Sequence, residues 1–191
     1  MTPIVVTPPS TEPITLAEAK AHLRVFLPDD DSYITSLIPA ARQAIEQRTG
    51  RAMLPQRVRV GMDAFCSTTR LPVLPLAVVD GLLVKYFDEN GDQQTANSSI
   101  YTINRYVEPV QVSLNPGESW PTISRIAGGV TFEYDVGYSD AAAVPGPLKQ
   151  WMLLAIGAMY ENREQVYAGA ETYSLPEDFM RLLWEPYMVY L

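Results

Sequence analysis

The sequence predicts an α+β fold in which a helical frame carries an inserted antiparallel β sheet or sandwich. Apolar residues recur at helical spacing in residues 14–54 and 145–191, whereas residues 55–140 alternate apolar and polar side chains between prolines. The 191 residues are 47% hydrophobic, which suffices for a buried core without disulfides or metals. We therefore expect one helical domain built from the two outer segments, with the middle segment inserted as a β domain.

Residues 1–13 are predicted to form an extended arm. Proline fixes φ and removes a backbone donor, so the four prolines of this segment disfavour a helix. They are Pro3, Pro8, Pro9 and Pro13. An extended arm of this kind suits contact with a neighbouring subunit.

Two helices are predicted next. Thr15 and Glu18 form a capping box that begins a short helix, which runs to about Val25. The carboxylates of residues 29–31 favour the positive end of a second helix, and Gly50 closes that helix in a left-handed conformation. The apolar stripe of the second helix is Ile34, Leu37, Ile38, Ala41, Ala44 and Ile45.

Residues 55–140 predict about six antiparallel strands, with a hairpin turn at Asn90-Gly91. The pattern becomes helical again at Pro147, a residue that suits a first helical turn. The following helix is apolar nearly all round, which predicts that it is buried and that its second side meets another subunit. A second capping box, Ser174 and Glu177, begins a short C-terminal helix, and an apolar tail follows it.

Charge and composition exclude several functions. The net charge is −8, with 14 basic and 22 acidic residues, so there is no basic surplus for a nucleic-acid surface. One cysteine and one histidine exclude a disulfide framework, a His-rich metal site and a triad that needs a second histidine. The longest apolar stretch is far shorter than the ~20 residues of a membrane span. Residues 29–31 are explained as solvated carboxylates at a helix end, so we assign no catalytic, metal or cofactor residue and expect a soluble protein that is not an enzyme.

Several stretches, taken in order, carry a resemblance to a known family. They are residues 14–25, residues 29–31 with Ile34 and Ile38, residues 49–52, residues 71–72 with 75–76, residues 120–121, residues 132–134 with 137–138, and residues 144–164. Together with the element order they make the chain similar to the head–tail connector family of tailed phages, also called adaptor or head-completion proteins. The similarity is to the longer form with a β insertion, which also occurs in phage-derived gene transfer agents.

The resemblance implies a structural protein of the virion neck, assembled in the host cytoplasm, without enzymatic activity or cofactors. Connector subunits, usually twelve, form a ring under the portal protein, extend the DNA tunnel and join the capsid to a stopper or tail-completion protein. DNA would pass through the lumen without specific binding, and no membrane is involved. The negative net charge suits such a wall, because it disfavours adhesion of DNA.

Two sets of residues are predicted to carry this function. The first builds the core and the intersubunit contact, and it consists of Ile34, Leu37, Ile38, Ala41, Ile45, Leu148, Trp151, Met152, Ile156 and Met159. The second is a C-terminal segment expected to dock on the portal, with Phe179, Leu182, Trp184, Tyr187 and Tyr190.

Three alternative functions remain open at this point. The β region is also typical of a sandwich that binds a glycan or a protein, in which case Trp120, Tyr101 and Tyr106 would form an exposed aromatic platform. The second alternative is a hydrolase that uses two carboxylates converging in a cleft, a geometry that residue spacing does not show. Another ring protein of the neck, such as a stopper, is the third.

Overall fold

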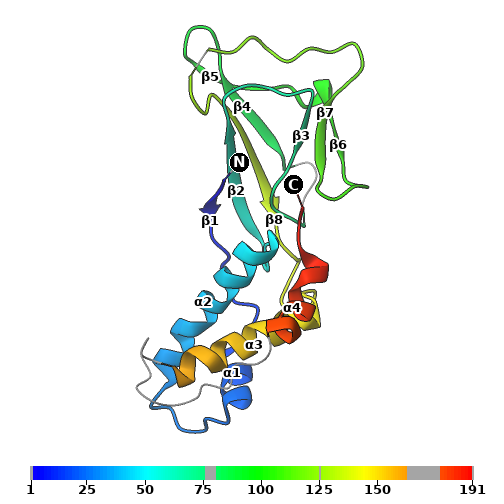
Figure 1. Ribbon diagram of the computed structural model, residues 1–191. Helices are drawn as coiled ribbons and strands as arrows, with labels where there is room; N and C mark the ends of the chain where they lie inside the picture. The colour runs from blue at the N-terminus through cyan, green and yellow to red at the C-terminus, as the bar shows by residue number, and fades with distance from the viewer. Residues whose placement is uncertain (1, 76–80, 125, 163–176, 191) are drawn as a thin grey trace. The chain divides into compact units, whose positions relative to one another are not determined.

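Two compact units make up the chain in the computed structural model, which describes residues 2–75, 81–124, 126–162 and 177–190. These residues contain four α-helices and two antiparallel sheets, which confirms the predicted α+β class (Figure 1). The helical unit comprises Thr11–Leu54 and Asp140–Met188. The β unit comprises Met1–Ser10, Pro55–Ser139 and Val189–Leu191.

The helical unit is built around two long helices. Its described helices are α1 (Leu16–Leu23), α2 (Asp31–Thr49), α3 (Gly146–Glu161) and α4 (Glu177–Trp184), and a 3-10 turn, η2 (Glu185–Tyr187), follows α4. Helices α1, α2 and α3 pack against one another, and α4 packs against α3.

The helix ends follow local sequence signals. The Glu18 N–H donates to Thr15 Oγ1 at 3.1 Å and the Thr15 N–H donates to the Glu18 carboxylate at 2.7 Å, which confirms the first capping box. Gly50 closes α2 with φ 69°, as predicted. Helix α1 ends two residues earlier than predicted, at Leu23, because Arg24 adopts a left-handed conformation with φ 58°.

Two of the three acidic residues at the start of α2, Asp30 and Asp31, make specific contacts, contrary to the expectation of solvated carboxylates. Asp31 pairs with the Lys20 ammonium at 2.5 Å, and the same ammonium donates to the Leu27 carbonyl. Asp30 accepts a hydrogen bond from the Tyr160 hydroxyl of α3. These residues therefore join α2 to its two neighbouring helices.

The β unit contains eight strands within the described residues. They are β1 (Pro3–Thr7), β2 (Gln56–Met62), β3 (Thr68–Arg70), β4 (Leu83–Phe87), β5 (Gln93–Thr95), β6 (Tyr101–Asn104), β7 (Gln111–Leu114) and β8 (Val130–Val136), with a 3-10 turn, η1 (Ser98–Ile100), before β6. One sheet has the order β1-β2-β8-β4-β5 and the other β3-β7-β6, and all pairs are antiparallel. Strand β1 lies in the predicted arm, which accounts for part of the excess over the six expected strands.

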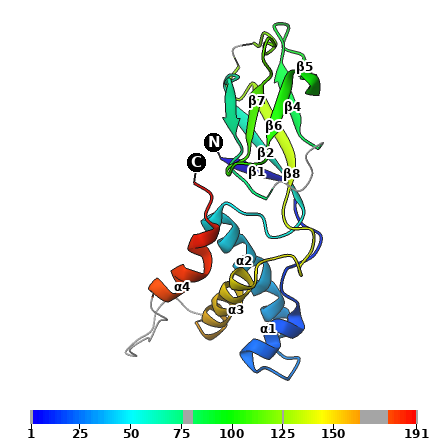
Figure 2. The same ribbon diagram turned by 90° about the vertical axis from the view of Figure 1, so that its right-hand side faces the viewer.

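The two sheets of the β unit lie face to face, and Figure 2 shows β6 and β7 in front of the larger sheet. Phe132 of β8 is opposite Val60 of β2 and Val84 of β4, and all three side chains are buried. Val112 of β7 is buried as well. Inward-facing residues of the central strands thus form the core between the sheets, whereas the edge strands β1 and β5 are exposed throughout.

The other face of the larger sheet carries ion pairs across its strands. Glu133 of β8 bonds to Arg59 Nε of β2 at 2.6 Å and to Lys85 Nζ of β4 at 2.9 Å. Arg57 pairs with Asp135 at 3.0 Å. Burial alone would raise the pKa of Glu133, but the hydrogen bonds from Lys85 and Arg59 outweigh it and hold the pKa below its usual range.

Replacing Glu133 with glutamine is expected to destabilise the β unit by about 1–2 kcal/mol at pH 7, because the amide keeps only one acceptor oxygen and no longer carries the charge that pairs with Arg59 and Lys85. A carboxylate with a lowered folded pKa stabilises the fold above its unfolded pKa, and this contribution disappears as the pH falls through the folded pKa. The gap between native chain and variant should therefore close below about pH 4. Urea unfolding at pH 7 and pH 3 measures the gap. The exposed Glu118→Gln exchange is the matched control, and a gap that is independent of pH would contradict the argument.

Candidate interaction surfaces

The residues predicted for the core and the intersubunit contact lie mostly inside the helical unit. Nine of the ten are buried, namely Ile34, Leu37, Ile38, Ala41, Ile45, Leu148, Trp151, Met152 and Ile156. Met159 is half-buried, and its carbonyl accepts a hydrogen bond from the Tyr33 hydroxyl. The stripes of α2 and α3 therefore face each other within one chain.

Helix α3 is apolar on several sides because several helices of the same chain cover it. Gly157 lies on the side of α1, where a Cβ atom on this residue would be 3.8 Å from His22 Nε2 and 3.9 Å from a Leu23 methyl group. Helix α4 packs on α3 as well. A neighbouring subunit is thus not needed to explain the composition of this helix.

A buried charge cluster ties the start of the helical unit to α2. Arg42 is only 6% exposed, and its Nε donates to Glu12 at 2.8 Å while its Nη1 donates to Glu46 at 2.9 Å. Glu46 also accepts a hydrogen bond from the Met53 N–H at 2.8 Å. Burial raises the pKa of Glu46 in spite of these bonds.

The C-terminal segment is held by two arginines, one in the last turn of α2 and one just after its glycine cap. The Arg48 guanidinium lies 4.7 Å from the ring centre of Trp184, and Arg51 Nε donates to the Tyr187 carbonyl at 2.6 Å. Leu182 is 69% exposed on α4. Tyr190, which belongs to the β unit, is exposed too, and the side chain of Phe179 lies outside the described residues.

A second exposed apolar surface lies in the loop after α1, and sequence reasoning missed it. Phe26 is 88% exposed and Leu27 is 68% exposed. The loop is fixed at both ends, because the Val25 N–H donates to the Lys20 carbonyl and the Lys20 ammonium donates to the Leu27 carbonyl. The sequence signal for this surface was two adjacent apolar residues, Phe26 and Leu27, that belong to the apolar stripe of neither neighbouring helix.

The aromatic residues considered for a glycan platform do not form one. Tyr101 is buried, and Trp120 stacks on Phe65 with ring centres 4.5 Å apart. The Trp120 indole N–H donates to the Cys66 carbonyl at 2.9 Å. Tyr106 is exposed by itself in the loop after β6, so the expected platform is wrong for two of its three members.

The described residues contain neither a cluster of metal ligands nor a helix that could span a membrane. No group of three His, Cys, Asp or Glu side chains among them is placed to hold a metal ion. None of the described helices has both the length and the apolar character that crossing a membrane requires.

The family model of the phage gp6-like head–tail connector proteins matches residues 13–116. This match spans more than half of the chain. The chain belongs to this family of head–tail connectors. The match favours the connector function over a glycan-binding sandwich or a stopper, and it runs from the capping box of α1 through β7.

Solved structures similar to this connector come from gene transfer agent (GTA) particles. A chain from the neck of an empty GTA particle, computed with C6 symmetry, is 24% identical and has a TM-score of 0.78. A chain from the virion of a native GTA particle gives the same values, and one from a native neck computed with C12 symmetry is 23% identical with a TM-score of 0.76. Each comparison covers 100% of this connector and 97% of the other chain. No curated protein matches the sequence.

The C-terminal segment of the connector lies outside the residues that the family model matches. The structural comparisons nevertheless cover it, because they extend over the whole chain. The shared fold therefore includes the part that carries Leu182 and Trp184.

Proposed function

We propose that this connector acts without catalysis as one subunit of a closed ring in the virion neck, with twelve copies under the portal protein. The ring extends the DNA tunnel and joins the capsid to a stopper or tail-completion protein. The observation that carries the proposal is the family match over residues 13–116. The likeness in fold to chains from particle necks, one of them computed with C12 symmetry, supports the ring and its place.

The charge of the chain supports passage of DNA without gripping it. Twelve copies with a net charge of −8 would give the ring a total of −96. A wall of the same sign as the phosphates disfavours adhesion, so the DNA slides through.

We further propose that the C-terminal segment docks on the portal. Leu182 is exposed on the helix α4, while Arg48 and Arg51 hold Trp184 and Tyr187 against the helical unit. A fixed segment that presents an apolar side chain loses little conformational entropy on binding. The rest of the predicted set, Phe179 and Tyr190, extends the same segment.

Replacing Leu182 with aspartate is expected to weaken portal binding by about tenfold or more, because an apolar side chain is lost and a charge is buried. Native mass spectrometry of the full chain mixed with portal protein measures both assembly and docking. A dodecamer of the 21.3 kDa chain has a mass of about 256 kDa.

The exposed Tyr106→Asp exchange in the β unit is the matched control and should bind as the native chain does. Unchanged docking of the Leu182→Asp ring would contradict the docking surface alone. The absence of any ring from the native chain with portal would contradict the ring itself.

A further inference from the structure

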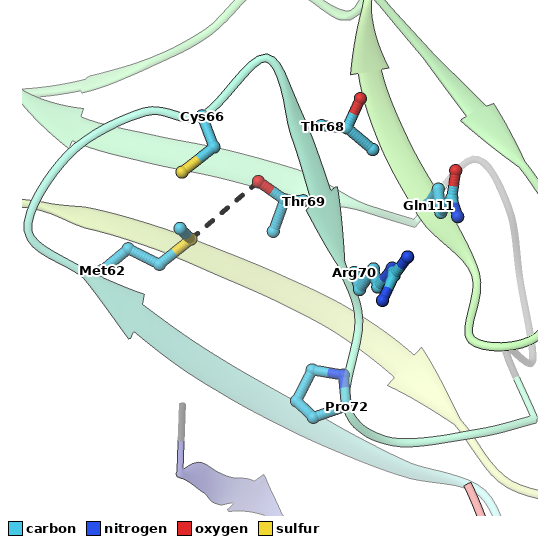
Figure 3. Close-up of a pocket in the computed structure, with 7 residues that line it drawn as sticks. All are labelled: Met62, Cys66, Thr68, Thr69, Arg70, Pro72 and Gln111. Atoms are coloured by element: carbon cyan, nitrogen blue, oxygen red, sulfur yellow. Dashed lines mark hydrogen bonds between the residues drawn. The ribbon is translucent and has the colours of Figure 1, made fainter. Parts of the chain in front are cut away.

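An open groove in the β unit lies beside strand β3 and has a volume of about 530 Å³. Figure 3 shows the residues that line it, with Thr68, Thr69 and Arg70 on β3 and Met62 at the end of β2. The remaining lining residues are Cys66, Pro72 and Gln111. Most of the wall therefore belongs to the short segment that contains β3.

Strand β3 is an edge strand, because the order of its sheet is β3-β7-β6. On one side it pairs with β7, and within the described residues no strand pairs with its other side. An edge strand presents unpaired N–H and C=O groups to any chain that can lie beside it.

Two backbone hydrogen bonds, one at each end of β3, show which N–H and C=O groups of the strand point to its free edge. The Leu71 N–H donates to the Val110 carbonyl, and the Leu114 N–H donates to the Ser67 carbonyl. In an antiparallel pair, hydrogen-bonded positions alternate with positions whose backbone groups point away. Thr68 and Arg70 occupy the intervening positions, so their N–H and C=O groups point to the free edge of the sheet.

The side chains along this edge define what an added strand would need. Arg70 is exposed and forms no ion pair within the described part of the chain. Thr69 is buried and turns inward, toward Met62, whose sulfur lies 3.9 Å from Thr69 Oγ1. A residue opposite Arg70 would share its face of the sheet, and a residue opposite Thr69 would face the apolar side.

We propose that this groove binds an extended acidic segment of another protein by β-strand addition. The carboxylate of the segment pairs with Arg70, the next residue is small and apolar and contacts Met62, and backbone hydrogen bonds form with Thr68 and Arg70. A second copy of the chain fits less well, since its other edge strands, β1, β5 and β6, contain no acidic residue. The inference goes beyond the ring and portal docking and does not depend on either.

The cysteine at the groove allows a sensitive test. Cys66 is exposed, lines the groove and is the one cysteine of the sequence. Disulfide exchange in excess 2-mercaptoethanol reports the preference of a weakly bound peptide for its site. The probes are Ac-Ser-Asp-Val-Thr-Ser-Cys-NH2 for antiparallel addition and Ac-Cys-Ser-Thr-Val-Asp-Ser-NH2 for parallel addition, each supplied as its mixed disulfide with 2-mercaptoethanol. The Cys66 thiolate attacks the probe sulfur, so that the Cys66–probe disulfide forms and 2-mercaptoethanol leaves as the thiol. Mass spectrometry of the intact full chain measures the captured fraction.

We expect one of the two probes to be captured about tenfold more strongly than its counterpart with lysine in place of aspartate. Arg70→Glu should reverse this preference, and the exposed Arg105→Glu exchange, outside the groove lining, should leave it unchanged. N-methylation of the probe amides that face β3 should abolish the selective capture.

Equal capture of the aspartate and lysine probes would overturn the acidic preference. Capture that survives N-methylation would overturn strand addition. A change in the native mass of the unbound chain on Arg70→Glu would show a second copy in the groove and overturn the choice of another protein. The Arg70→Glu chain should still form the ring and dock on the portal. Failure of this proposal and failure of the proposed function therefore give different results.

Discussion

Replacing Arg42 with methionine is expected to destabilise the helical unit by about 3–5 kcal/mol at pH 7. The exchange removes the guanidinium from between Glu12 and Glu46 and leaves a buried carboxylate without that cation. Because burial already raises the pKa of Glu46, loss of Arg42 should raise it further. The cost should then shrink as the pH falls and Glu46 takes up a proton in the folded state.

Hydrogen exchange with mass spectrometry measures this effect, because peptides from α2 and α3 report the helical unit separately from the β unit. The exposed Arg24→Met exchange is the matched control and should leave exchange unchanged. The double variant Arg42→Met/Glu46→Met should recover a large part of the stability, since it removes both buried charges. A double variant that is as unstable as the two single changes added together would refute the buried-pair argument.

Local signals predicted the helical unit well. The capping box at Thr15 and the left-handed Gly50 depend on residues a few positions apart, and both are present. The periodic stripe of α2 is buried as predicted except at Ala44, which is exposed. The Arg42 cluster was not predicted, because Glu12 is thirty residues away and no local pattern pairs them. The same limit applies to β1, whose pairing with β2 joins segments about fifty residues apart.

Candidate surfaces were harder to predict than the fold. The apolar composition of α3 indicated a second subunit. Helices α1, α2 and α4 of the same chain pack on α3, while Leu153 and Leu154 are only half-buried, so the contact with a second subunit stays a prediction. Conversely, Phe26 and Leu27 lie in a loop just before Pro28, and the periodicity of neither neighbouring helix predicts whether their side chains are exposed. The groove at β3 depends on which strand forms the edge of its sheet, and strand order is set by packing of the whole unit.

Replacing Phe132 with alanine is expected to destabilise the β unit by about 3–5 kcal/mol. Loss of a ring buried between the two sheets leaves a cavity that the surrounding strands cannot move to fill. Phe132 is opposite Val60 and Val84 in the centre of the larger sheet. The matched control is Leu83→Ala, on the neighbouring strand and half exposed on the other face, which should cost much less.

Because the chain divides into two compact units, each with its own core, the two large effects should remain apart. Phe132→Ala should speed amide exchange in β2, β4 and β8 and leave α2 and α3 unchanged, whereas Arg42→Met should do the reverse. The free-energy changes of the combined variant should add, since the two sites share no contact. If Phe132→Ala instead exposed the amides of both units to the same extent, the chain would unfold as one cooperative body, and the helical unit would depend on the β core for its stability.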